Sequence, residues 1–392
     1  PFFEQFHELM QKVPRPALIC EKSENCTYSH NTSSSKNCYL CFSCFHCEDS
    51  YYNYMIKDCK DVVDNTSVLN SELSYECINC RGCYNGNYLQ DCENCIDSSF
   101  CYDSRSLKNC FGCVNLEHKE YHIFNEPVTK EYYENFIKQM ESHDTLQELQ
   151  KKFEEFKSTQ TLRPFKNTGS ENSTGNHILF SKNAQECFSV ENCEDVKYCI
   201  YTNNLKDSLD VFGALMGGEL QYETGGAGAS INTKYACMSW HNSDSAYLNY
   251  CNTCSDIFGC IGLRHAKYCV LNKQYTKEEY EALLEKITAH MQRTKEFGEF
   301  FPPVFSPYGY NETKAQDFFP LTREQALQKN YRWKDTDPAE NKNAQSLTCE
   351  KCHKNFKLIA QELNFYQRKK LPEPKNCPDC RYKQRLTRAG GF

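Results

Sequence analysis

The sequence lacks the features that mark a membrane protein, a disordered protein or an enzyme with a well-known motif. No segment approaches the roughly 18 to 20 consecutive apolar residues that a membrane-spanning helix needs, and there is no long low-complexity tract. No metalloprotease, nucleophile-elbow, phosphate-loop or dinucleotide-binding motif occurs. No basic-then-apolar leader opens the chain, which begins at Pro1. We therefore expect a folded chain that is not an enzyme.

Cysteine is what the sequence has in excess: 27 of 392 residues. In the first third of the chain, all cysteines share one phase of a three-residue period: Cys20, Cys26, Cys38, Cys41, Cys44, Cys47, Cys59, Cys77, Cys80, Cys83, Cys92, Cys95, Cys101, Cys110 and Cys113. A period of three fits neither an α-helix nor an ordinary strand. It predicts a mainly β fold, a narrow β-solenoid (β-helix) in which every third side chain points inward.

Two coil lengths, 12 and 18 residues, agree with the three-residue period. Cys41, Cys59, Cys77, Cys95 and Cys113 form an unbroken column when the sequence is written in rows of 18. Rows of twelve also satisfy the period but give no such column. We therefore expect 18 residues per coil, with cysteine stacked on cysteine at the spacing of neighbouring strands.

The Cys-rich unit occurs twice. Residues 109–140 match residues 256–287 at an offset of 147, and the ELSYE segment at Glu72 matches ELQYE at Glu219 with the same offset. Further upstream the match shifts by one residue, so that Cys47 falls on Cys193. The chain body is therefore a tandem duplication with a single-residue insertion in the second copy.

Each copy is expected to end in a capping helix, because apolar residues at helical spacing follow Thr129 in the first copy and the capping box Thr276–Glu279 in the second. The polar segment 166–175 is the expected linker between the copies. The predicted organisation is an N-terminal helical lead-in (1–19), a first Cys-rich solenoid with capping helices (20–165), a second with its capping helix (176–300), an extended connector (301–347) and a zinc module (348–392).

The 23 cysteines before residue 348 allow three interpretations. They could be small buried core residues, disulfide staples between coils, or ligands of a metal ladder. We favour core packing, because an odd total cannot pair completely and because Val, Ser, Ile, Asn and Leu replace cysteine at equivalent positions.

The C-terminal segment has a clearer chemistry. Cys349, Cys352, Cys377 and Cys380 form two CxxC knuckles separated by 24 residues. Four thiolates in paired knuckles form a closed tetrahedral zinc site, and a segment this small needs metal to fold. We expect one structural Zn²⁺ that takes no part in catalysis.

The same segment is basic. From Thr348 onward the sequence has eleven Lys and Arg and four acids, a net charge of +7. Because the whole chain carries −7, the rest of the chain carries −14. Aromatic and basic residues alternate around the knuckles, as in RNA-binding zinc modules, although a basic surface on a protein-docking finger is an equal alternative. The candidate nucleic-acid contacts are Tyr366, Arg368, Lys369, Lys370, Lys375, Arg381, Lys383, Arg385 and Arg388.

Cys349–Arg381, with its CEKC, QEL, FY and CPDCR motifs, resembles the bacterial "probable zinc-ribbon" treble clef family. The body, with KNCYLC, NCFGCVNL, LNKQYTKEEYE and FPLTREQAL, resembles uncharacterised, duplicated Cys-rich proteins of candidate-phyla bacteria. The resemblance implies a similar zinc finger ahead of the PFFEQF segment and no particular activity. This chain has Val62, Asn65, Ser98 and Ser104 where those relatives usually have cysteine.

The leading functional prediction is a cytoplasmic, zinc-stabilised scaffold or adaptor. Its acidic solenoid would contact proteins, and its basic module would dock on RNA or a ribonucleoprotein such as the ribosome. An exported structural or surface protein with disulfide-stapled coils is the alternative, with which five Asn-x-Ser/Thr sequons are compatible. Metal storage or redox relay by the coil cysteines is a weaker one. No small-molecule substrate and no membrane contact is expected.

Overall fold

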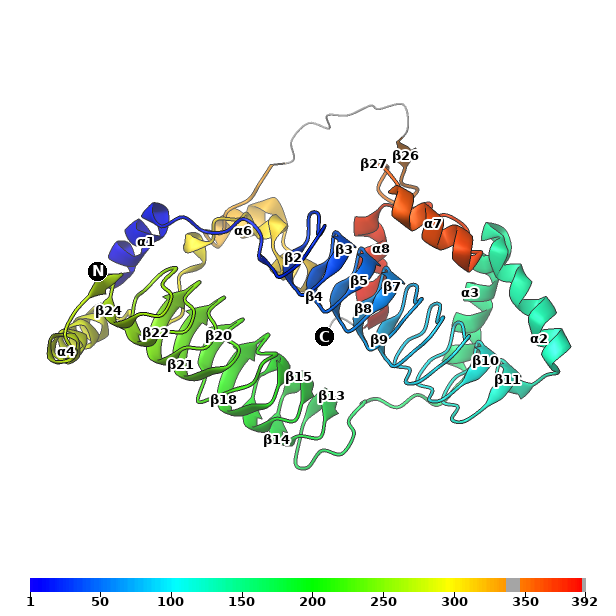
Figure 1. Cartoon of the computed structure of the whole chain (residues 1–392), viewed down its shortest axis with the longest axis horizontal. Helices are drawn as coiled ribbons and strands as arrows, with labels where there is room; N and C mark the ends of the chain where they lie inside the picture. The colour runs from blue at the N-terminus through cyan, green and yellow to red at the C-terminus, as the bar shows by residue number, and fades with distance from the viewer. Residues whose placement is uncertain (336–345, 390–392) are drawn as a thin grey trace. The chain divides into compact units, whose positions relative to one another are not determined.

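The computed structural model describes residues 1–335 and 346–389, which belong to two compact units. One unit contains residues 17–162 and the C-terminal module, and the other contains residues 1–16 and 163–335. Each unit is built around one solenoid of short, mostly parallel strands (Figure 1). The predicted mainly β fold is therefore confirmed.

The first solenoid contains three sheets, ordered β1-β2-β4-β6-β8-β9, β3-β5-β7 and β10-β11-β12. Between β9 and β10 the coils continue through single-residue parallel bridges such as Glu72 to Tyr84 and Tyr84 to Ile96. The strands are β1 (Cys20–Glu21), β2 (His30–Ser33), β3 (Lys36–Tyr39), β4 (Phe42–Phe45), β5 (Glu48–Tyr51), β6 (Tyr54–Lys57), β7 (Lys60–Val63), β8 (Thr66–Leu69), β9 (Ile78–Arg81), β10 (Lys108–Phe111), β11 (Glu120–Ile123) and β12 (Glu126–Pro127).

Each coil of the first solenoid has twelve residues, so the expected length of 18 is wrong. Cys38 pairs with Ser50, and Ser50 pairs with Val62, in a parallel register that advances by twelve. A shift of 18 residues corresponds to one and a half coils. Cys41 and Cys59 therefore lie on opposite sides of the solenoid, and the apparent cysteine column alternates between two sides.

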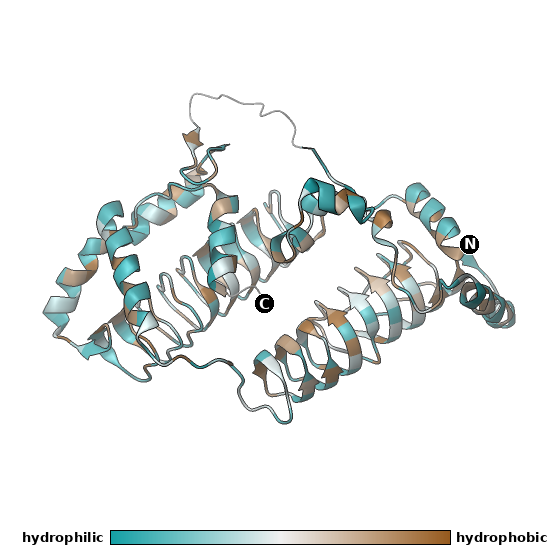
Figure 2. Cartoon of the chain, turned by 180° about the vertical axis from the view of Figure 1, so that it is seen from behind, coloured by the Kyte–Doolittle hydropathy of each residue, from teal (hydrophilic) through white to brown (hydrophobic). Residues whose placement is uncertain are grey.

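The three-residue period has a backbone cause. Every third residue has a left-handed conformation, as at Asn37, Leu40 and Ser43 with φ of 53°, 49° and 57°. The residue that follows each of them points inward, as Cys38, Cys41 and Cys44 do, and is at most 1% exposed. Apart from glycine, Asn and Asp tolerate this conformation best, which accounts for their frequency at these positions. Because small side chains such as these cysteines fill the interior, the bore is narrow. Figure 2 shows the hydropathy alternating along the solenoid strands.

Two buried asparagines replace cysteine inside the first solenoid and link successive coils. The side-chain oxygen of Asn53 accepts from the backbone N–H of Asn65 at 2.8 Å, and that of Asn65 accepts from the N–H of Cys77 at 2.7 Å. Their amide nitrogens donate to the carbonyls of Val62 and Ser74. These asparagines thus bond to backbone groups of neighbouring coils, which a thiol does only weakly.

The second solenoid is one sheet in which coil length varies. Its strands are β13 (Gly175–Leu179), β14 (Lys182–Gln185), β15 (Cys187–Glu191), β16 (Glu194–Lys197), β17 (Ile200–Asn203), β18 (Leu205–Phe212), β19 (Gly218–Glu219), β20 (Tyr222–Gly225), β21 (Ser230–Cys237), β22 (Ser243–Asn249), β23 (Ser255–Phe258), β24 (Lys267–Val270) and β25 (Lys273–Gln274).

The register from β18 to β20 advances by thirteen residues, as in the pair Leu209 and Tyr222. This coil carries the single-residue insertion that the sequence comparison indicated. The expected linker, 166–175, instead contributes to the first coil, because Thr168 bridges to Leu179 and Glu171 to Lys182. Its polar Asn and Ser side chains bond to the next coil, which explains a composition that resembles a linker.

Helices occur in both places where the sequence predicts capping helices. In the first unit, α2 (Lys130–Ile137), the 3-10 turn η1 (Lys138–Glu141) and α3 (His143–Ser158) pack on the last coils through Phe100, Phe111 and Phe153. In the second unit, α4 (Lys277–Thr294) begins with the predicted capping box of Thr276 and Glu279 and buries Tyr280 and Met291. In each unit these helices cover core residues that a coil end would otherwise expose.

The N-terminal helix α1 (Phe2–Lys12) belongs to the second unit. Phe2, Phe3 and Phe6 are buried among Tyr247 and Phe258 of the second solenoid. The carboxylate of Glu296 accepts from the backbone N–H groups of Phe2 and Phe3 at 3.1 and 2.8 Å. The carboxylate thereby satisfies N–H groups that have no partner within the helix.

The described part of the expected extended connector is folded instead. It forms η2 (Pro303–Phe305), η3 (Tyr310–Glu312), α5 (Lys314–Phe318) and α6 (Arg323–Gln328). Residues 336–345 of that connector lie outside the described residues. The C-terminal module contains β26 (Leu347–Thr348), β27 (Asn355–Phe356), α7 (Ala360–Lys369) and α8 (Pro378–Ala389).

Candidate metal centre and its docking surface

The four predicted zinc ligands come together in the C-terminal module. Cys349 and Cys352 lie in the turn between the antiparallel strands β26 and β27, and Cys377 and Cys380 lie at the start of α8. Their sulfur atoms all lie within 4.8 Å of one another, and the Sγ atoms of Cys352 and Cys377 are 3.7 Å apart. Tetrahedral Zn–S bonds of about 2.3 Å place sulfur atoms about 3.8 Å apart. The donor set thus fits one structural metal ion.

The knuckle backbone favours thiolate at Cys349. Burial acts to raise the pKa of this thiol, but hydrogen bonds from the backbone at Cys377, Cys352 and Lys351 outweigh it and lower the pKa to about 6. The backbone N–H of Cys349 donates to the carbonyl of Lys354, which closes the knuckle. Metal-binding cysteines are deprotonated, so this environment suits a ligand.

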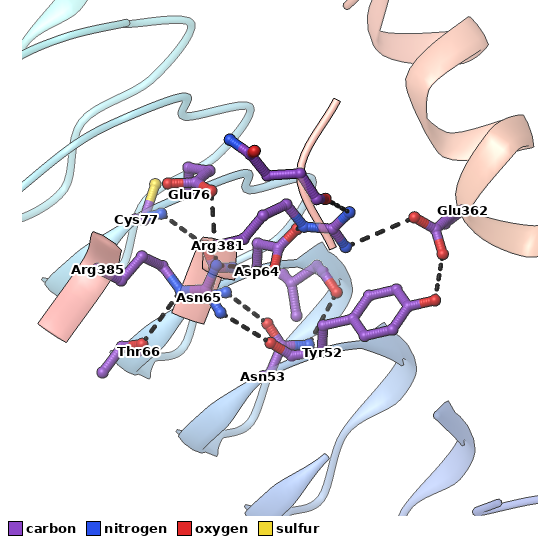
Figure 3. A network of polar contacts seen from close by, with 12 residues as sticks. Tyr52, Asn53, Asp64, Asn65, Thr66, Glu76, Cys77, Glu362, Arg381 and Arg385 are labelled. Atoms are coloured by element: carbon purple, nitrogen blue, oxygen red, sulfur yellow. Dashed lines mark hydrogen bonds and ion pairs between the residues drawn. The ribbon is translucent and has the colours of Figure 1, made fainter. Parts of the chain in front are cut away.

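The module is docked on the first solenoid through α8. The side chains of Arg385 and Asp64 are both fully buried, with Arg385 Nη1 2.7 Å from Asp64 Oδ1 (Figure 3). The same guanidinium lies 3.5 Å from Glu76 Oε1, donates from Nη2 to the carbonyl of Tyr52 at 3.2 Å, and donates from Nε to the hydroxyl of Thr66 at 3.4 Å. Arg385 is therefore enclosed by the solenoid.

Arg381 and Arg388 extend this contact along α8. Arg381 Nε lies 2.8 Å from Asp64 Oδ2, and its guanidinium lies over the ring of Tyr52 at 4.9 Å. Arg388 Nη2 lies 2.6 Å from Glu76 Oε2. The spacing of the three arginines, four and then three residues, places them on one face of the helix.

Glu362 of α7 completes the buried network. The hydroxyl of Tyr52 donates to Glu362, and Arg381 lies 3.6 Å from the same carboxylate. Burial raises the pKa of Glu362 and of Glu76, while the neighbouring arginines oppose that rise. Each of these acids thus lies beside an arginine of α8, and the pairing offsets part of the cost of burying both charges.

Aromatic packing accompanies the ion pairs. Tyr366 and Phe365 of α7 contact the ring of Tyr75 at centroid distances of 5.5 and 6.2 Å. Both α7 residues are at most 1% exposed. The module is therefore joined to the solenoid by an apolar as well as a polar surface.

The edge of the contact carries two further cations. Arg368 Nη2 lies 2.7 Å from Asp61 Oδ1, and Lys369 Nζ donates to the carbonyl of Leu73 at 2.7 Å and to Asn85. Burial lowers the pKa of Lys369 to about 7.

The structure assigns most of the predicted nucleic-acid contacts to this internal surface. Tyr366, Arg381 and Arg385 are buried, so their predicted role in stacking on bases or contacting phosphates is wrong for this conformation. Arg368, Lys369 and Arg388 bond to the solenoid, and Lys375 lies 3.6 Å from Glu350. Lys370 and Lys383 are exposed and form no ion pair with described residues. The acidic partners Asp64 and Glu76 were missed because they resemble solvent-facing turn residues.

The coil cysteines form no comparable cluster. Among the described residues, the four module cysteines are the only group of three or more His, Cys, Asp or Glu with metal-binding geometry. All 27 cysteines lie in the described part of the chain and are free thiols. Many coil thiols donate to backbone carbonyls, as Cys41 does to Ser50 at 3.1 Å. These features suit packing better than ligation.

Comparison with known proteins supports the module. Residues 345–389 match the family described as "Probable treble clef domain". This match contains all four cysteines and confirms the predicted treble clef. No curated protein matches the chain. The predicted kinship of the solenoid body with Cys-rich bacterial proteins stays a prediction.

Two solved structures were aligned over much of the chain. A "putative acetyltransferase" from Desulfovibrio desulfuricans G20 is 10% identical, with 72% of this chain and 81% of that chain covered and a TM-score of 0.15. A UDP-N-acetylglucosamine acyltransferase from Campylobacter jejuni is 8% identical, with 71% and 90% covered and a TM-score of 0.09. At these TM-scores neither likeness bears on the fold or activity of this chain. No helix in the described residues has the length and apolarity to cross a membrane.

Proposed function

We propose that the protein is a non-enzymatic scaffold in which a zinc-bound treble clef module is fixed to the wall of a β-solenoid. The buried pairing of Asp64 with both Arg381 and Arg385 carries this proposal. Burying charged groups costs desolvation energy, and a buried charge that loses its partner is strongly destabilising. Fully buried ion pairs therefore indicate a permanent contact rather than one that forms and breaks. A four-thiolate site also leaves no open coordination position for catalysis.

Zinc removal tests this arrangement in the full chain. Without metal the small module loses its fold, so α7 and α8 should lose hydrogen-exchange protection, and the solenoid residues around Tyr75 should become exposed. Cys380→Ser should do the same, and Cys254→Ser in the second solenoid is the matched thiol control. Retention of α8 protection after complete zinc removal would contradict the proposal.

RNA or ribonucleoprotein docking is the second candidate. It is favoured by exposed lysines of the module that do not take part in its contact with the solenoid. Lys351, Lys354, Lys357, Lys370 and Lys383 are exposed and form no ion pair with described residues, although Lys351 and its neighbours share the module surface with Glu350. Exposed lysines suit contacts with phosphates, which weaken steeply with salt.

The test is binding of a single-stranded RNA of mixed sequence, measured by fluorescence anisotropy at several salt concentrations. Replacing the five lysines by glutamine should abolish binding, whereas Lys206→Gln and Lys234→Gln in the second solenoid should not. Equal binding by the two variants would remove this candidate and would leave the scaffold proposal untouched.

A further inference from the structure

The second solenoid repeats the surface on which the treble clef module is docked in the first. Parallel register places Asp64 and Glu76 on neighbouring coils, because Val63 bridges to Tyr75. The pair Leu209 and Tyr222 places Asp210 and Glu223 in the same relation. With the insertion in the longer coil taken into account, Asp210 corresponds to Asp64 and Glu223 to Glu76.

The aromatic residues beside these acids are repeated with the same geometry. The rings of Tyr75 and Tyr88 are 5.4 Å apart at 77°, and those of Tyr222 and Tyr235 are 5.7 Å apart at 74°. The next ring in each series is stacked: Phe100 on Tyr88 at 4.4 Å, and Tyr247 on Tyr235 at 4.5 Å. The duplicated surface is therefore conserved within this chain in shape as well as in residue type.

The two surfaces differ in what covers them. Asp64 is fully buried by α8, whereas Asp210 is exposed and Tyr198, the counterpart of Tyr52, is 42% exposed. A groove of about 500 Å³ borders the second surface at Tyr222, and Leu209 and Phe297 also line it, whereas Tyr198, Asp210 and Glu223 do not.

The acids of the second surface have no cationic partner among the described residues. Glu223 Oε2 is buried and makes no hydrogen bond. Burial raises the pKa of Glu223, a hydrogen bond with Tyr222 opposes that rise, and the charges of Asp210 and Glu299 add to it. The nearby Lys197 lies over the ring of Tyr198 at 4.5 Å instead. A buried carboxylate oxygen without a partner is costly, and a cation supplied from outside would relieve that cost.

Exposed apolar side chains border the same acids. Phe212, the counterpart of Thr66, is 44% exposed, and Leu220 is 48% exposed. Acids beside exposed aromatic and aliphatic side chains are typical of an interface whose partner contributes arginine.

We propose that this face of the second solenoid, built from Tyr198, Asp210, Tyr222 and Glu223, docks a helix of another polypeptide that carries arginines at the spacing found in α8. The first unit shows which chemistry this surface type accepts, since Arg381, Arg385 and Arg388 pair with Asp64 and Glu76. The inference extends the scaffold function to a second face, while the zinc-removal test above concerns only the first.

The probe is a helical peptide with the sequence of α8, Cys380→Ser, constrained by a hydrocarbon link between positions 379 and 383, whose side chains are exposed in the module. It is added to the zinc-loaded full chain, and binding is followed by fluorescence anisotropy. The module's own α8 holds the first surface at high effective concentration, so the free peptide should report the second.

Binding should be saturable and should weaken about tenfold or more in the Asp210→Asn, Glu223→Gln variant. Glu194→Gln with Glu219→Gln is the matched control, because both acids are exposed and lie on the coil side that Lys206 shares, and it should leave binding unchanged. A peptide with its three arginines replaced by glutamine should not bind. No binding by the wild-type chain, or equal binding by the Asp210/Glu223 variant, would overturn the proposal.

Discussion

Arg385 and Asp64 are 321 residues apart in the sequence and form a 2.7 Å ion pair with both side chains fully buried. This pair joins the C-terminal module to a coil near the middle of the first solenoid. Because Asp64 also pairs with Arg381, one carboxylate bridges two guanidinium groups of α8.

Replacing Asp64 should therefore detach α8. Asp64→Asn leaves two buried arginines without their main partner, and the loss of one member of a buried pair costs about 3–5 kcal/mol. We expect the free energy of local opening of α8, measured by hydrogen exchange, to fall by about that amount.

Asp61→Asn is the matched control for this prediction. Asp61 pairs with Arg368, whose side chain is 46% exposed, and exposed pairs contribute about 0–1 kcal/mol. Similar losses in the two variants would show that burial of the Asp64 pair does not hold the module.

The asparagines inside the first solenoid should contribute more than a packed side chain alone. Asn65→Ala removes the acceptor of the Cys77 N–H, which is left buried and unsatisfied, and one of the two donors to the Ser74 carbonyl, which keeps its bond from the Val63 N–H. An unsatisfied buried N–H costs about 1–3 kcal/mol. Chemical unfolding followed by circular dichroism should show the loss. Ser50→Ala, which removes only a hydroxyl bonded to the Glu48 carbonyl, should cost less than about 1 kcal/mol; equal costs would contradict this role.

Docking of α1 should depend on pH through Glu296. Burial acts to raise the pKa of this carboxyl, but hydrogen bonds from Thr294, Phe3 and Phe2 lower it below its ordinary value of 4.5. A lowered folded-state pKa gives stability that is fully present above pH 4.5 and is lost as the pH falls through the folded pKa.

Hydrogen exchange of α1 should therefore accelerate below pH 4.5, beyond the intrinsic rate change. Glu296→Gln should weaken α1 docking by about 1 kcal/mol at neutral pH and remove this dependence. Glu299→Gln, an exposed neighbour, should keep it. An unchanged pH profile in Glu296→Gln would show that the cap is not the cause.

The sequence pattern predicted the parts of the fold that repeat locally. The three-residue period follows from a left-handed residue before each inward side chain. Each of these two positions has a characteristic residue composition, which recurs every three residues in the sequence. The capping box at Thr276 and the four zinc ligands are likewise set by short spacings, so they could be identified without a structure.

The coil length and the docking surface depend on distant pairing. Backbone register, not the identity of inward residues, sets twelve residues per coil, and cysteine, valine, serine and asparagine all fit the bore. Written in rows of twelve, the sequence aligns Tyr52, Asp64, Glu76 and Tyr88, a signal for the acidic surface that rows of 18 conceal. No local pattern shows that arginines of α8 meet these acids.

Native mass spectrometry with thiol counting, on protein purified without oxygen, tests the scaffold account most directly. The account predicts one zinc ion per chain, held by four cysteines, and 23 further free thiols. The buried ones should react with an alkylating agent only after unfolding, whereas the exposed Cys20 should react in the folded protein. Disulfide-bonded coils, or several metal ions per chain, would contradict a solenoid whose cysteines serve as packing residues.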